Sequence, residues 1–234
     1  MGLNIGSGIT IGSGIQITPI LGIVTTNLTL YLDPAQTASY SGTGTTWSDI
    51  SGNGNNETLV GGPTYATKYF SFNGSTQYAT GSGTPLGQTA YTKSFWFNLA
   101  SYTGNNNTVS GDNHFSYFGG SNRLQNGHSA WANFGAFTSV TVFALNTWYH
   151  VCVTFNTATG MALYVNGALD STYVSTSTNP TNVALASAGR IDIANYGGGN
   201  LLTGSIGQVL VYNRDLTANE ALQNFSVTRA TYGV

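Results

Sequence analysis

The sequence predicts an all-β protein built as a two-sheet antiparallel sandwich. The first observation is an apolar segment, 148–156, followed closely by a second, 161–165. In the first segment, alternation places two sets of side chains on opposite faces of a strand: Tyr149, Val151, Val153 and Phe155 on one, and Trp148, His150 and Cys152 on the other. A strand that is apolar on both sides is expected where both faces of its sheet are covered.

Composition is the second observation. The chain has 234 residues with 31 glycines and 12% aromatic residues, which is typical of many short strands joined by tight turns in a single large domain. Six basic and eight acidic residues give a net charge of −2. That charge is too weak to favour binding to nucleic acid or to an anionic membrane.

Turn and strand signals then place the elements. Asn166-Gly167 readily supplies the positive φ angles of a hairpin turn, so a partner strand is expected near 168–174. Further strands are expected at 28–33, 69–74, 93–99 and 206–213, with weaker candidates at 114–118, around Leu124, at 131–137 and at 140–145. Residues 105–112, nearly all Asn, Gly, Thr and Ser, are expected to form an exposed loop.

One helix is predicted, near the C-terminal end. Thr217-Ala218-Asn219-Glu220 has the spacing of a capping box, and the helix is expected to run to about Phe225. Cys152 is the single cysteine, so a disulfide framework is excluded and a buried apolar role is expected for it. The sequence shows neither the pattern of a secretory signal nor that of a membrane span.

Residues 1–26 differ from the rest because they carry no charged side chain. Ile5-Gly6-Ser7-Gly8-Ile9-Thr10 repeats as Ile11-Gly12-Ser13-Gly14-Ile15-Gln16. Two such repeats cannot bury their own isoleucines, so we expect an extended arm that orders against another subunit through Ile5, Ile9, Ile11 and Ile15. The alternative is a flexible leader. The predicted organisation is an assembly arm, 1–26, and a sandwich domain, 27–234.

Several motifs together resemble a known superfamily. They are Trp47-x-Asp49-x-Ser51-Gly52-Asn53-Gly54, Phe70-x-Phe72-Asn73-Gly74, the segments 148–156 and 163–167, and Gly204-x-Ile206-x-x-Val209-x-Val211-Tyr212-Asn213-Arg214-x-Leu216-Thr217-x-x-Glu220. This set, over about 28–225, resembles the laminin-G-like branch of the concanavalin A-like lectin/glucanase superfamily. The resemblance implies a jelly roll of two antiparallel sheets, and many such domains bind carbohydrate or protein, often with calcium at the rim.

A second resemblance concerns biological context. The Gly-Ser-Ile leader, Tyr31-Leu32-Asp33-Pro34 and the tail Asn224-Phe225-x-x-Thr228-Arg229-x-x-Tyr232-Gly233 are similar to laminin-G-like domains in structural proteins of tailed phages, particularly marine ones. This implies a non-enzymatic, oligomeric virion protein, in a capsid decoration, fibre or tail, held through its arm by copies of itself and other virion proteins. The alternative is a carbohydrate-binding adhesin that recognises a host glycan.

Catalysis is not favoured by the distribution of acidic residues. Glycosidases need two carboxylates across the scissile bond, and this chain has its acids scattered singly, with Glu220 explained as a helix cap. The histidines, His114, His128 and His150, accompany no recognisable nucleophile motif. We therefore expect no enzymatic activity.

Binding sites are expected in the Asn/Gly-rich loops. No cofactor is required by the sequence, but Asp112 with Asn113, and Asp192 with Asn195, could supply oxygen ligands to calcium; the alternative is that they are ordinary turn residues. For a sugar, the stacking candidates are Trp131 and Tyr196, with Asn195 beside Tyr196 to bond hydroxyl groups. A packing role for these aromatic residues is the alternative.

Overall fold

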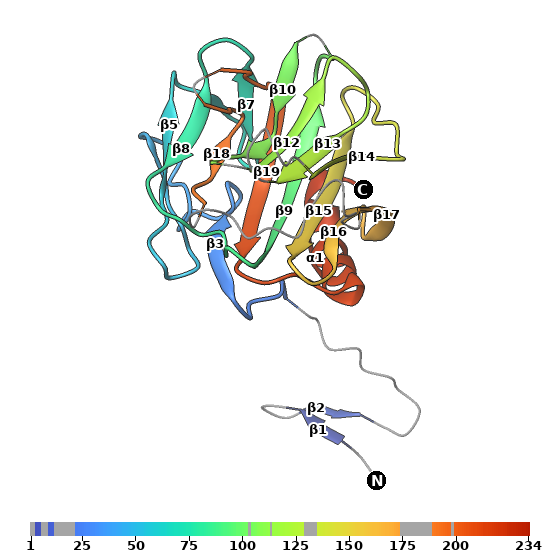
Figure 1. Cartoon of the computed structure of the whole chain (residues 1–234). Helices are drawn as coiled ribbons and strands as arrows, with labels where there is room; N and C mark the ends of the chain where they lie inside the picture. The colour runs from blue at the N-terminus through green and yellow to red at the C-terminus, as the bar shows by residue number, and fades with distance from the viewer. Residues whose placement is uncertain are drawn as a thin grey trace.

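The computed structural model describes residues 3–5, 9–11, 22–102, 104–112, 114–128, 135–173, 189–197 and 199–234. It confirms the predicted class: antiparallel sheets form a sandwich, and one helix follows the last strand (Figure 1). The helix packs on the outer side of the larger sheet. Among the described residues, no helix is long and apolar enough to cross a membrane.

The larger sheet has eight strands. Its path runs through β17 (Ala168–Tyr173), β16 (Gly160–Val165), β15 (Trp148–Asn156), β9 (Ala90–Leu99), β19 (Thr203–Tyr212), β7 (Phe70–Asn73) and β6 (Thr64–Tyr65), and β3 (Leu28–Leu32) also pairs with β19. The strongest predicted strands therefore lie side by side at its centre. The hairpin between β16 and β17 turns at Asn166 and Gly167, with φ of 48° and 78°, as predicted.

Two smaller sheets form the opposing layer. One contains β11 (Val109–Ser110), β18 (Asp192–Ile193), β8 (Tyr78–Gly81), β5 (Glu57–Val60) and β4 (Thr46–Trp47). The other contains β10 (Asn105–Asn107), β12 (His114–Gly119), β13 (Gln125–His128) and β14 (Gly135–Thr138). A single apolar core joins all three sheets, because the buried cluster includes Phe95 and Val153 from the large sheet, Trp47 and Ile193 from the first small sheet, and Phe118 from the second.

The alternation predicted for β15 is present in the structure. Val151, Val153 and Phe155 belong to the core between the sheets. Cys152 is fully buried on the other side of the sheet, in a cluster with Leu210 of β19 and Ala221 of the helix. Both faces of the central strands are therefore covered, one by the opposing sheets and the other by the helix.

The helix α1 (Ala218–Tyr232) is longer than predicted. The capping box between Thr217 and Glu220 forms as expected, but the helix continues past Phe225 to a C-cap at Gly233, which has φ of 74°. The prediction was wrong because residues 226–231 include Ser226, Val227, Thr228 and Thr231, whose intrinsic helix propensity is low. Tyr232, in the last turn, stacks on Trp96 of β9 with ring centroids 4.4 Å apart, and this contact holds the extra turns against the sheet.

A glycine in β19 makes room for this tyrosine. A Cβ atom at Gly207 would collide with the hydroxyl and ring of Tyr232. At the same place the amide of Gln208 donates to the Tyr232 hydroxyl at 2.7 Å. The side chain of Tyr232, in the last turn of the helix, therefore packs directly on the backbone of β19.

The loop after β4 is organised by one carboxylate. Asp49 Oδ1 accepts from the amides of Tyr31 and Ser51, each at 2.9 Å, and Oδ2 accepts from the amide of Asn55 at 2.9 Å. Ser51 Oγ also donates to Oδ2. The Trp-x-Asp-x-Ser-Gly-Asn-Gly motif is thus a scaffold motif, in which Asp49 satisfies backbone groups of a turn-rich loop.

Two further sequence predictions were wrong. Residues 105–112 do not form an exposed loop: 106–111 are buried in and beside β10 and β11. Their polar side chains satisfy buried backbone, as when Asn106 Oδ1 accepts from the amide of Thr203 at 2.8 Å. Residues 140–145 form no strand, because the amides of Val140 and Thr141 donate to the carboxylate of Asp170 instead of to a neighbouring strand.

A buried lysine links the two layers. Lys93 of β9 is fully buried and its Nζ donates to the carbonyl of Val109 at 2.8 Å and to Ser116 Oγ at 3.0 Å, while His114 Nδ1 lies 3.3 Å away. Burial lowers the pKa of Lys93 to about 7. This side chain connects the large sheet to β11 and β12 across the core.

At the N-terminal end, β1 (Leu3–Ile5) and β2 (Ile9–Ile11) form a two-stranded antiparallel sheet in which Ile5 is opposite Ile9. This agrees with the extended ribbon predicted for the first repeat. Ile15, the fourth isoleucine of the predicted arm, lies outside the described residues. The division into 1–26 and 27–234 stays a prediction.

The buried lysine predicts a pH dependence of stability. Its pKa is about 7 in the folded chain against an ordinary 10.5, so between these values the unfolded chain binds more protons and stability rises with pH. From about pH 7 to 8.5 the free energy of unfolding should rise with a slope of at most about 1.4 kcal/mol per pH unit from this group. Urea unfolding of Lys93→Met should show a flatter dependence. Equal slopes for both chains would contradict the assignment.

Candidate functional site

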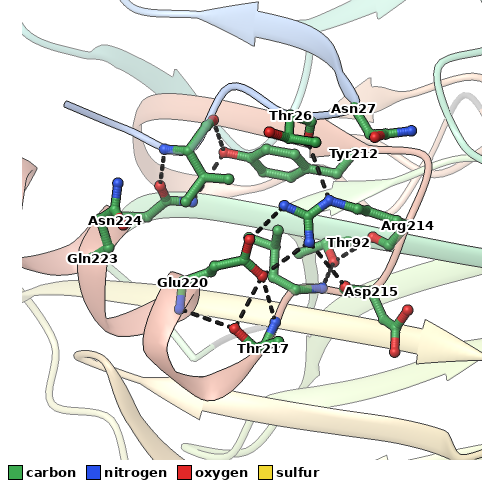
Figure 2. Close-up of polar contacts among 12 residues, drawn as sticks. Thr26, Asn27, Thr92, Tyr212, Arg214, Asp215, Thr217, Glu220, Gln223 and Asn224 are labelled. Carbon is green, nitrogen blue, oxygen red and sulfur yellow. Dashed lines mark hydrogen bonds and ion pairs between the residues drawn. The ribbon is translucent and has the colours of Figure 1, made fainter. Parts of the chain in front are cut away.

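The candidate site is the place where residues 22–27, the root of the arm, leave the sandwich. The amide of Val24 donates to Asn224 Oδ1 of α1 at 2.9 Å, and its carbonyl accepts from the hydroxyl of Tyr212 at 2.8 Å. Figure 2 shows Tyr212 and Asn224. Asn224 Nδ2 donates in turn to the Tyr212 hydroxyl at 3.0 Å. These three buried residues therefore close a ring of hydrogen bonds that fixes the backbone of the root.

Further bonds hold the root on either side of Val24. Gln223 Nε2 donates to the carbonyl of Gly22 at 2.8 Å. Arg214 Nε donates to the carbonyl of Thr26 at 3.2 Å (Figure 2). Asn27 is bonded through both its carbonyl and its side chain to Asn213, at the end of β19. The root is thus attached over its whole length to the sheet and the helix.

Arg214 is itself fixed by the cap of the helix. Its guanidinium makes two bonds to the carboxylate of Glu220, at 2.9 and 2.6 Å, and Glu220 also accepts from the amide of Thr217 at 2.9 Å (Figure 2). The bonds from Arg214 lower the pKa of Glu220 to about 2. The capping motif seen in the sequence therefore does two things: it starts α1 and it orients an arginine towards the arm root.

A groove of about 960 Å³ begins at the root and runs along α1. Gly22 and Ile23 line one part of it, and Leu222 and Val227 of the helix and Tyr31 of β3 line others. Leu222 and Val227 are 47% and 38% exposed, although both are large and apolar. No local pattern in the sequence indicates this groove, because the groove needs the second half of the helix, which was not predicted.

The described residues include two of the three sugar-binding residues predicted from the sequence, Tyr196 and Asn195. Trp131 lies outside the described residues. Tyr196 is half-buried at a tight turn, where its backbone exchanges two hydrogen bonds with Gly199, and Asn195 is buried at 3% exposure. Of Tyr196 and Asn195, Tyr196 is therefore the residue whose side chain is accessible to solvent.

The predicted calcium ligands do not fit a calcium site. Arg190 lies between two of them, with its guanidinium 3.5 Å from Asp112 and 3.2 Å from Asp192, and Thr80 donates to Asp192 at 2.6 Å. Asn113, the predicted ligand next to Asp112, lies outside the described residues. Over the part of the chain that the structure describes, no group of three or more His, Cys, Asp or Glu side chains could hold a metal ion. A guanidinium replaces the oxygen ligands that calcium needs.

Sequence reasoning missed Glu57, a buried carboxyl of β5. Burial, and then the nearby Asp192, raise its pKa well above the usual value, and its Oε2 has no hydrogen-bond partner. The pattern of the four-residue strand Glu57–Val60 does not indicate that this side chain would be 2% exposed. Because Asp192 is also fully buried, neither carboxyl is open to a substrate in this structure. The expectation of no enzymatic activity stays a prediction.

The ring around Val24 predicts the effect of a substitution. Asn224→Ala removes the acceptor of a buried amide and a donor to Tyr212, which should cost about 1–3 kcal/mol of unfolding free energy. Gln223→Ala, at the exposed neighbouring bond, should cost about 0.5 kcal/mol or less. Urea unfolding measures both, and proteolysis within 22–27 should accelerate for Asn224→Ala alone. Equal effects of the two substitutions would mean that the ring does not fix the root.

Solved structures with a similar fold are distant in sequence. A sialidase from Trypanosoma rangeli aligns with 93% of this chain and 36% of its own, with a TM-score of 0.68 and 14% identity. The receptor-binding domain of a botulinum neurotoxin C/D mosaic aligns with 87% of this chain and 52% of its own, with a TM-score of 0.66 and 13% identity. The chain thus spans about a third to a half of these proteins, and the likeness shows the fold. Curated protein sequences give no significant match.

A family model matches residues 72–221, from β7 through the first turn of α1. That range contains the long central strands β9, β15 and β19 and the Arg214–Glu220 cap, which are the elements that build the larger sheet and start its helix. It covers well over half of the chain, and its description agrees with the sandwich observed. The chain belongs to the concanavalin A-like lectin/glucanases superfamily, in its laminin-G-like branch.

Proposed function

We propose that this chain is a non-enzymatic structural component of a virion, as a capsid decoration, fibre or tail part, displaying its sandwich from an N-terminal arm. The observation that carries the proposal is the fixed root of that arm. A leader without a role needs no anchoring, yet Gly22, Val24 and Thr26 are each bonded to a different side chain of the sheet end or helix. An arm fixed at its base holds the domain in a defined direction relative to whatever the arm binds.

The composition of the arm supports attachment by apolar contacts. Residues 1–21 contain six isoleucines, two leucines and no charged side chain. Two three-residue strands, β1 and β2, cannot bury such side chains by themselves, because an isolated two-stranded ribbon is marginal in water. A partner surface in an assembly would supply the missing cover.

A carbohydrate-binding adhesin is the second candidate, and the superfamily favours it. One structural neighbour, botulinum neurotoxin type C, is described as depending on two ganglioside molecules for cell entry; it aligns at 14% identity with a TM-score of 0.64. In this chain the half-buried ring of Tyr196, on an Asn/Gly-rich turn, is the described aromatic residue that we assign to sugar stacking.

Deleting residues 1–21 tests the leading proposal. The deletion keeps the bonded root, so the unfolding free energy should change by about 0.5 kcal/mol or less. Analytical ultracentrifugation should show that the full chain associates and that the shortened chain is monomeric, and the shortened chain should fail to enter the virion. Unchanged association and incorporation would overturn the proposal.

The adhesin candidate has an independent test. The chain lacking residues 1–21 should still bind a glycan on an array, because the sandwich alone would carry that site, and Tyr196→Ala should reduce the signal at least tenfold. Tyr78→Ala, another half-buried tyrosine on β8, is the matched control and should leave the signal unchanged. If the wild-type chain gives no signal on the array, the candidate is excluded.

A further inference from the structure

We infer that the groove along α1 receives the isoleucine-rich arm of a second copy of this chain, so that copies are joined by exchange of arms. The inference rests on the proposed function, in which the arm drives assembly. It adds the identity of the partner and the surface that the arm occupies.

The groove has the character of an uncovered docking surface. Leu222 and Val227 of α1 are 47% and 38% exposed, and Leu222 lies beside the Gly167 turn of the large sheet, while Phe225 and Tyr232 pack on Trp96. Both side chains thus keep a large part of their apolar surface open to solvent. Together with Ile23 they line a concave apolar surface of the kind that usually binds a partner.

The low charge of the groove is compatible with the uncharged arm. Asp33 is the one charged residue among the residues that line the groove, and its carboxylate already accepts from Gln208 Nε2 at 3.2 Å and from the amide of Ala35 at 3.0 Å. Residues 1–21 have no charged side chain. An uncharged, isoleucine-rich segment can therefore enter the groove without bringing a charge with it, while the Asp33 carboxylate keeps its hydrogen-bond donors.

The position of the groove favours exchange between copies. It begins at Gly22 and Ile23, so the segment that a copy donates and the surface that accepts one are adjacent in every chain. A reciprocal exchange about a two-fold axis would fill both grooves and cover both arms, with identical contacts in each copy. Among the described strands, β1 and β2 pair with each other and with no strand of the sandwich, which leaves the ribbon free to bind elsewhere.

Cross-linking between differently tagged copies tests this directly. One copy carries Ile9→Cys and the other Val227→Cys, and the native Cys152 is buried, with a pKa raised by burial, so it will not react. Mild oxidation of the mixture should give a disulfide between the two tags. Val140→Cys is the matched control, because Val140 is 68% exposed and does not line the groove; it should give at least tenfold less product with Ile9→Cys.

A charge substitution separates this inference from the proposed function. Leu222→Asp should weaken self-association at least tenfold, while Val140→Asp should not, and circular dichroism checks that both remain folded; Val227→Ser is the milder second variant. If these groove variants associate normally while deletion of residues 1–21 abolishes association, the arm drives assembly but the groove is not its acceptor. A disulfide confined to single copies of a chain carrying both Ile9→Cys and Val227→Cys, without any product in the mixture, would also overturn exchange between copies.

Discussion

The structure depends on covering a sheet that is apolar on both faces. In β9 and β15, alternate residues point into the core between the sheets, and the residues between them point outward, where Trp96 and Cys152 are fully buried. Antiparallel sheets commonly leave one face to water, but this one cannot, because its outer face would expose aromatic and sulfur-containing side chains. Helix α1 removes that face from water through Phe225 and Tyr232, so the helix is part of the fold and not an appendage.

The same requirement places the functional elements. A helix held on the outer face brings Asn224 to the backbone of Val24, and its cap brings Arg214 to that of Thr26. The root of the arm is therefore fixed by residues whose first role is to cover the sheet. Leu222 and Val227 of the helix remain partly exposed and line the groove. In this account the arm root and the groove are two consequences of one packing arrangement.

The long strands and the helix start could be predicted because their signals are local: alternation in β15, the Asn166-Gly167 turn, and the capping box at Thr217. What failed depends on contacts distant in sequence. Asn106 and Ser110 look like loop residues, but buried backbone groups from other segments use their side chains. Lys93 is buried because carbonyl and hydroxyl groups of β11 and β12 meet it across the core. The predicted calcium ligands face Arg190, and nothing in the local pattern indicates that pairing.

Native-state hydrogen exchange, read at the Val24 amide, at α1 and at β19, tests the account most directly. If covering the outer face is part of the fold and the arm root is fixed to that cover, all three should open together, with exchange free energies close to that of global unfolding. If Val24 or the amides of α1 exchanged as fast as free peptide while β19 remained protected, the helix would be a loosely attached appendage, and the account would be contradicted.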